Sequence, residues 1–152
     1  HAVDLRDRLG LRNVVGIVLS LVFLGYELKR SNDIAEAEAV AQIYSMTNEM
    51  SLVMAEDPAL SQVFRRAQSD FKSLDADEQF RFLILLESVV NSSEAAWKYY
   101  DKGIISRAET DSYTRGLCRL LGLDESLAEM WRSDAHNRLP GYYHYATDVC
   151  RL

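Results

Sequence analysis

The longest apolar stretch of the chain lies near its amino end, where the thirteen residues Val14–Tyr26 carry no charge. Only Ser20 interrupts this run, so a helix over it has no polar face to turn toward water. An arginine precedes the run, and Lys29 and Arg30 follow it closely. The pattern predicts a single transmembrane helix over residues 13–30.

The run Val14–Tyr26 is short for a transmembrane helix, so other interpretations stay open. A hydrocarbon core about 30 Å thick needs roughly 20 helical residues, and shorter runs are often buried helices of soluble bundles. Cationic side chains that snorkel to the head groups extend the effective span from Arg12 to Lys29, about 18 residues or ~27 Å. Tyr26 lies where an interfacial aromatic would lie. A cleaved signal peptide is disfavoured, because the following GYELKRSN is a poor cleavage site.

Two small residues mark one face of this helix. Gly16 and Ser20 lie four positions apart, a spacing at which a second helix can approach closely in a membrane. We therefore expect Gly16 and Ser20 to form a helix–helix contact within the bilayer.

The pattern after residue 30 predicts helices only. Apolar or small residues with heptad-like spacing predict a helix that packs into its own bundle: Val40, Ile43, Thr47, Met50 and Met54. Helix starts are indicated at Asp57-Pro58, Asp75 with Glu78, Ser106 with Glu109, and Asp124. Helix ends are indicated at Gly103 and Gly122, and Pro140-Gly141 precedes one last short helix. No segment shows the period-2 alternation of a strand.

The predicted fold class is therefore all-α, with one transmembrane helix running into a compact bundle of about five helices. We divide the chain into a juxtamembrane segment at residues 1–12, the transmembrane helix at 13–30 and the bundle at 31–152. The long helix that ends near Lys102 is expected to turn these residues inward: Phe80, Leu83, Ile84, Val90 and Trp97.

Charge and length narrow the class of partner. At 152 residues the chain can bury a core without help from a metal, and its net charge is -6. Residues 1–30 hold five basic and three acidic side chains, so the acidic charge lies in the body. An acidic body argues against nucleic acid as a partner.

The sequence lacks several common motifs of catalytic, phosphate-binding and metal-binding sites. No Gly-rich phosphate loop, no nucleophile elbow and no metalloprotease motif occurs, so we expect no enzyme, no cofactor and no metal site. His136 and His144 are interpreted as surface histidines near a loop. Cys118 and Cys150 are interpreted as two reduced thiols rather than a bridge, with Cys118 as a small core residue.

Aromatic residues crowd the second half of the chain. Three tyrosines in four positions, Tyr142, Tyr143 and Tyr145, do not all fit on the inward face of one short helix. Exposed tyrosine is enriched at protein contacts. We therefore predict a protein-contact surface at Tyr142, Tyr143 and Tyr145.

Four stretches together resemble a widespread set of small, uncharacterised bacterial proteins. They are GIVLSLVFLGYELKRSN at 16–32, EDPALSQVFRRA at 56–67, EQFRFLILLESV at 78–89 with WKYYDKGII at 97–105, and MWR at 130–132 with LPGYYHY at 139–145. The resemblance implies a membrane helix followed by a compact helical domain, often on the cytoplasmic side of the inner membrane. It implies no activity. The charged start LRDRLGLR departs from the group, so orientation stays open.

Two functions follow as hypotheses. The first is a single-pass membrane protein that acts by contact, as an accessory or structural subunit of a larger membrane complex, with integral membrane proteins and the lipid bilayer as partners. The second is a membrane-tethered domain that senses a small-molecule ligand near Glu87, Asn91 and Trp97, where the polar run Asn91-Ser92-Ser93-Glu94 interrupts a helix. A weaker third option is a metal enzyme or hydrolase that uses His136, His144 and Cys118.

Overall fold

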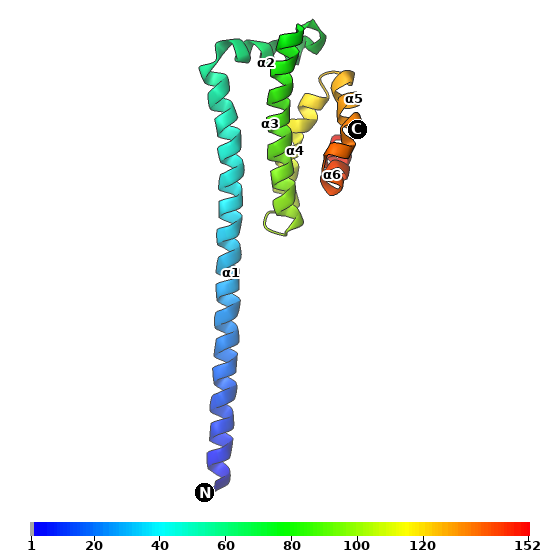
Figure 1. Cartoon of the computed structure of the whole chain (residues 1–152). Helices are drawn as coiled ribbons and strands as arrows, with labels where there is room; N and C mark the ends of the chain where they lie inside the picture. Colours follow the sequence, from blue (N-terminus) through cyan, green and yellow to red (C-terminus); the bar gives the residue numbers. More distant parts are fainter. Residues whose placement is uncertain (1) are drawn as a thin grey trace. The chain divides into compact units, whose positions relative to one another are not determined.

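The chain is helical throughout the part that the structure describes. This computed structural model describes residues 2–152, with side chains from residue 14 onward. The elements in order are α1 (Ala2–Glu56), α2 (Pro58–Asp70), η1 (Phe71–Ser73), α3 (Ala76–Asp101), α4 (Arg107–Leu121), α5 (Glu125–Ser133), η2 (Ala135–Asn137) and α6 (Pro140–Cys150) (Figure 1). No strand occurs in residues 2–152. The all-α prediction is confirmed.

The chain divides into two compact units, His1–Glu38 and Ala39–Leu152. Within the described residues, no helix is both long enough and apolar enough to cross a membrane. The fold thus gives no support to the predicted transmembrane helix at 13–30, and the predicted segment 1–12 lies outside the residues whose side chains are described.

Helices of the second unit begin at the capping residues that the sequence marks. The Asp57 carboxylate accepts hydrogen bonds from the backbone N–H groups of Ala59 and Leu60, and Pro58 opens α2. Capping boxes open α3 at Asp75 with Glu78 and α4 at Ser106 with Glu109, and the Asp124 side chain caps α5. These predicted starts are confirmed.

Helix ends follow the glycines. Gly103 comes just after the C-cap Lys102 of α3 and has a φ of 70°, a left-handed conformation that glycine adopts without a Cβ clash. Gly122 is the C-cap of α4. Pro140 is the first residue of α6, the last predicted helix. Capping residues, glycines and prolines in the sequence therefore determine where the helices begin and end.

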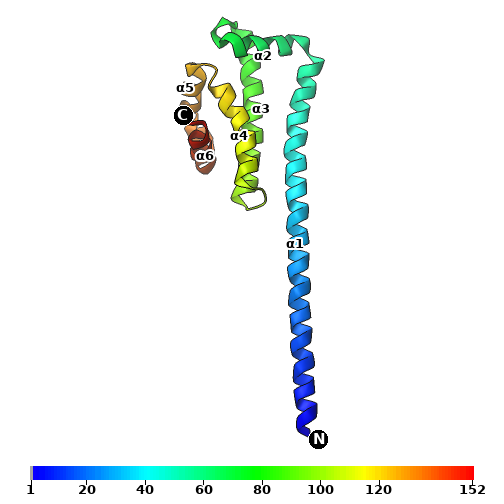
Figure 2. The same cartoon turned by 180° about the vertical axis from the view of Figure 1, so that it is seen from behind.

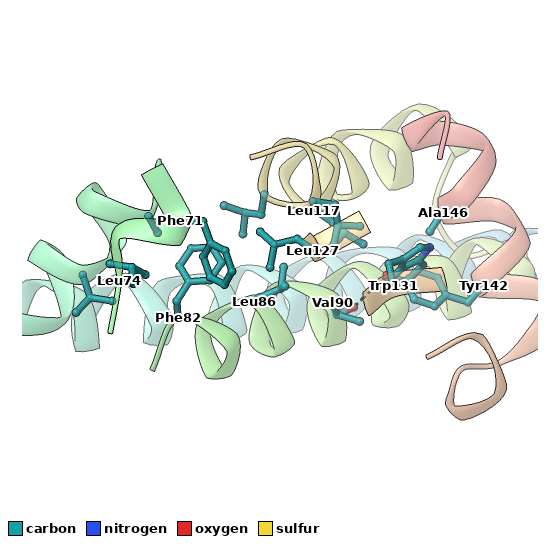
Figure 3. Close-up of a cluster of buried hydrophobic side chains, with 14 residues drawn as sticks. Phe71, Leu74, Phe82, Leu86, Val90, Leu117, Leu127, Trp131, Tyr142 and Ala146 are labelled. Atoms are coloured by element: carbon teal, nitrogen blue, oxygen red, sulfur yellow. Dashed lines mark hydrogen bonds between the residues drawn. The ribbon is translucent and has the colours of Figure 1, made fainter. Parts of the chain in front are cut away.

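One main core holds the second unit together. Helices α3 and α4 lie side by side, and α5 and α6 pack against α4 (Figures 1 and 2). Figure 3 shows the shared apolar cluster, which includes Phe71, Leu74, Phe82, Leu86, Val90, Leu117, Leu127, Trp131, Tyr142 and Ala146. Two of its aromatic members, Tyr142 and Phe82, are fully buried.

The last turns of α1 pack through a smaller cluster. Ala39 and Ile43 of α1 are buried against Ala96 of α3 and Ile105. Farther along the predicted seam, Thr47, Met50 and Met54 are only half-buried. The predicted packing into the bundle therefore holds for the part of this stretch around Ala39 and Ile43.

The inward face of α3 differs from the predicted one at two positions. Phe80 is 65% exposed and Ile84 is 53% exposed, whereas Phe82, Leu85 and Leu86 are buried. The stretch FRFLILL is apolar on both sides of the helix, so its periodicity does not say which side is turned to the core.

Candidate functional site

The first unit exposes a continuous apolar surface. In the apolar segment, which we define as Val14–Leu28, eleven large apolar side chains are each at least half exposed. They are Val14, Val15, Ile17, Val18, Leu19, Leu21, Val22, Phe23, Leu24, Tyr26 and Leu28. They occur at nearly every position, so they surround the helix. Contiguous exposed apolar surface of this kind marks a contact with protein or lipid.

Gly16 and Ser20 lie on this exposed surface. The Ser20 hydroxyl donates a hydrogen bond to the Gly16 carbonyl at 2.9 Å, so this polar group is satisfied within the helix. A Cβ atom added to Gly16 would meet no described atom within 4 Å apart from its chain neighbours and its own helix backbone. The face is open to a neighbouring helix, and the predicted contact there stays a prediction.

The tyrosine surface is corrected by the structure. Tyr142 is fully buried, and its hydroxyl donates to the carbonyl of Val90 at 3.3 Å, so it cannot form a contact surface. Tyr143 is half-buried and stacks on Trp131 with ring centroids 5.5 Å apart. Tyr145 is half-buried and donates to the Asp111 carboxylate. Desolvation raises the pKa of both Tyr142 and Tyr145, which keeps these phenols neutral in the fold.

The interpretation of two reduced thiols is also wrong. Cys118 of α4 and Cys150 of α6 form a disulfide, with their Cα atoms 4.9 Å apart. The two cysteines are 32 positions apart in sequence, and only the packing of α6 on α4 brings them together. The bridge removes Cys118 as a candidate nucleophile.

Metal chemistry has no geometric basis in the described residues. Among them, no group of three or more His, Cys, Asp or Glu side chains is placed to hold an ion. His136 and His144 are both exposed, as expected for histidines near a loop.

The residues predicted for a ligand site do not come together. Glu87 pairs with Arg138 through two hydrogen bonds of 2.8 and 2.6 Å, and the same guanidinium lies 2.9 Å from Asp134. The hydrogen bond that Arg138 donates to the Glu87 carboxylate is the main cause of the raised pKa of Arg138. Trp97 packs against the main core, 6.2 Å from the ring of Tyr142.

The polar run in α3 has mainly a structural explanation. The hydroxyls of Ser93 and Thr114 are buried and 2.9 Å apart, and Thr114 also donates to the Thr110 carbonyl at 3.0 Å. Glu94 pairs with Lys98 one turn later at 2.8 Å. The Ser93–Thr114 contact links α3 to α4, and the other two contacts satisfy polar groups within one helix.

Asn91, by contrast, lies on a groove that sequence reasoning missed. The α1–α3 groove, as we name it, is a 520 Å³ hollow between the last turns of α1, the start of α2 and the first half of α3. Its walls are Met46, Met50, Val53, Leu60, Ile84 and Leu85. Ile84 was expected in the core, but it is exposed and lines this groove.

Comparison with protein-family models, with curated proteins and with solved structures gave no significant match to this chain.

Proposed function

We propose that this chain is a single-pass, membrane-anchored helical protein that acts by protein contact, as an accessory or structural subunit of a larger membrane complex. The observation that carries the proposal is the all-round exposure of the eleven large apolar side chains of the apolar segment. Leaving that much apolar surface in water is unfavourable, at roughly 25 cal/mol per Å². Lipid tails and partner helices both remove it from water.

The apolar segment reaches across a bilayer only with help from its flanks. A bilayer core needs roughly 20 helical residues, more than the thirteen uncharged ones of Val14–Tyr26. The span from Arg12 to Lys29 in the sequence is 18 residues, or ~27 Å as a helix, and modest thinning of the bilayer covers the rest. Tyr26, which is 63% exposed, then lies at the head-group level.

The disulfide supports a particular side of the membrane for the second unit. Disulfides persist in oxidising compartments and are rare in the cytosol of mesophiles. The Cys118–Cys150 bridge therefore favours a body on the outer side of the inner membrane, opposite to the side that the resemblance implies.

An anchored protein meets its partners in two dimensions, which raises its effective concentration near them. In the bilayer no hydrophobic effect drives helix association, so close packing of small residues matters most. The face of Gly16 and Ser20 is the surface that we assign to a partner's transmembrane helix.

Fractionation of the full chain from its native membrane tests the anchor. We expect the wild type to resist alkaline carbonate extraction and Val22→Arg, at the centre of the apolar segment, to be released. Leu52→Arg is the matched control, because Leu52 is 60% exposed on the same helix but lies outside the segment. A wild type that leaves the membrane without detergent would contradict the anchor.

Two further measurements test the partner and the side. In mild detergent, native electrophoresis should show a species well above the 17.3 kDa of one chain, and Gly16→Leu should reduce it. A free monomer would contradict the accessory role. Maleimide should label the chain in native membranes only after reduction, whereas immediate labelling of Cys118 would favour the cytoplasmic side.

A second candidate function, ligand sensing by the second unit, is supported by the α1–α3 groove. Of the three residues predicted for that role, only Asn91 lines the groove. The volume of 520 Å³ and the mostly apolar walls fall within the range of small-molecule pockets.

A further inference from the structure

We propose that the α1–α3 groove binds an amphiphile with one alkyl chain and an anionic head group, a carboxylate or a phosphate, with the chain along the apolar walls and the head at Arg81. This inference names the ligand class for the second candidate function. It does not depend on the membrane anchor.

The middle of the groove is apolar and accessible. Met46, Met50 and Val53 lie on the α1 side, and Ile84 and Leu85 lie on the α3 side. Val53 and Ile84 are 52% and 53% exposed, so an occupant would remove apolar surface that now faces water. Methionine side chains are flexible and polarizable, which suits an alkyl chain of variable length.

Polar groups stand at the two ends of the groove. Arg81 and Asn91 both line it and are ten residues apart on α3, about 15 Å along the helix axis. Between these two residues the lining is mainly apolar, with Glu49 of α1 and Ser88 of α3 as further polar members.

Arg81 is the group available to bind an anion. It is exposed and makes no ion pair or hydrogen bond with any described residue. Two carboxylates also line the groove, but Asp57 is occupied as the N-cap of α2. Glu49 lies eight residues before Asp57 and accepts only a long 3.4 Å hydrogen bond from Ser45. A guanidinium without a partner favours a carboxylate or phosphate head.

The dimensions favour an alkyl chain over a peptide. The groove has a volume of 520 Å³, which falls within the range of small-molecule pockets. A peptide that binds by strand addition needs the edge of a sheet, and no sheet exists in residues 2–152.

The test uses the full chain in nanodiscs of a zwitterionic phospholipid, with methyl NMR as the readout. Dodecanoate and dodecyl phosphate are the anionic probes, and dodecyl maltoside is the neutral probe with the same alkyl chain. We expect the methyl resonances of Met46, Met50 and Ile84 to shift with probe concentration. The methyl groups of Ile105 and Met130, which lie outside the groove, should stay in place.

Substitutions distinguish the contribution of the anionic head group to binding from that of the alkyl chain. Arg81→Gln should weaken binding of both anionic probes about tenfold, by loss of one charge-assisted hydrogen bond, and leave the maltoside unchanged. Ile84→Ser should weaken all three probes about fivefold. The matched controls are Arg115→Gln, an exposed arginine on α4, and Phe80→Ser, an exposed residue one turn from Ile84 that does not line the groove. Neither control should change any affinity.

Three results would overturn the proposal. They are equal shifts in all methyl groups, an effect of Phe80→Ser as large as that of Ile84→Ser, and an unchanged preference for anionic probes in Arg81→Gln. A preference for only one anionic probe would identify the head group. Val22→Arg, which tests the anchor, should retain full binding, so loss of the anchor and loss of the groove are measured separately.

Discussion

Single buried hydroxyls stabilise the contact between α3 and α4. Ser93 and Thr114 satisfy each other at 2.9 Å in an environment without water access. Thr114→Val leaves the Ser93 hydroxyl without that partner, so we expect a loss of about 1–3 kcal/mol in the free energy of unfolding. The double variant Ser93→Ala/Thr114→Val should recover most of that loss. Urea titration followed by circular dichroism measures both, and a double variant no better than the single one would contradict the pairing.

Two glycines of the body should respond to alanine in opposite directions. A Cβ atom on Gly141 would lie 2.7 Å from Cζ2 of Trp97, a rigid ring in the core, so Gly141→Ala should destabilise the fold. Gly116, in the middle of α4, has no atom within 4 Å of an added Cβ. Gly116→Ala should stabilise by up to about 1 kcal/mol, through helix propensity. Melting temperatures of the pair are the readout, and a shift of the same sign in both would refute the assigned contact.

At the scale of elements, the capping box of α4 should make stability depend on pH. The Ser106 hydroxyl hydrogen-bonds to Glu109, which lowers the pKa of that carboxylate below its ordinary value. A lowered pKa in the fold means that the stabilisation is present above the ordinary pKa and is lost as pH falls through the lowered one. Ser106→Ala should cost about 1 kcal/mol at neutral pH.

The difference between wild type and Ser106→Ala should shrink in acid, because Glu109 then gains a proton in both. Denaturant titrations from neutral to acidic pH measure it. Ser112→Ala, an exposed position in the same helix, is the control and should show no such trend. A difference that stays constant down to low pH would exclude the charge of Glu109 as the cause.

Helix boundaries were predictable because capping is local. Asp75, Ser106 and Asp124 bind backbone groups within three residues of themselves, so the sequence carries the whole signal. The side of α3 that faces the core was predictable only where apolar residues are sparse, as at Val90. In FRFLILL both sides are apolar, and the choice between Phe80 and Phe82 depends on α2, η1 and α4, which the periodicity does not contain.

At the scale of the whole molecule, the disulfide should contribute much of the stability of the body. It closes a loop of 32 positions, for which chain entropy predicts about 3–4 kcal/mol. The variant Cys118→Ser/Cys150→Ser should lose that amount. Reduced wild type should match the variant, and thermal unfolding with and without reductant measures both. A wild type that is insensitive to reductant would contradict a contribution from the bridge.

The candidate sites were less predictable than the fold because they depend on long-range packing. Tyr142 is 52 positions from Val90, whose carbonyl its hydroxyl reaches, and the sequence gives no sign that this tyrosine turns inward. The α1–α3 groove is formed by three helices. In contrast, the apolar segment is a property of neighbouring residues, and its exposure matches the uniform pattern read from sequence.

The bridge between α4 and α6 also determines how the molecule would respond to a protease. A single nick in the stretch between α5 and α6 falls inside the covalent ring closed by Cys118 and Cys150. The two pieces would migrate as one band on a non-reducing gel and separate only with dithiothreitol. A cut in this stretch would therefore leave the two pieces covalently joined until the compartment around the protein became reducing.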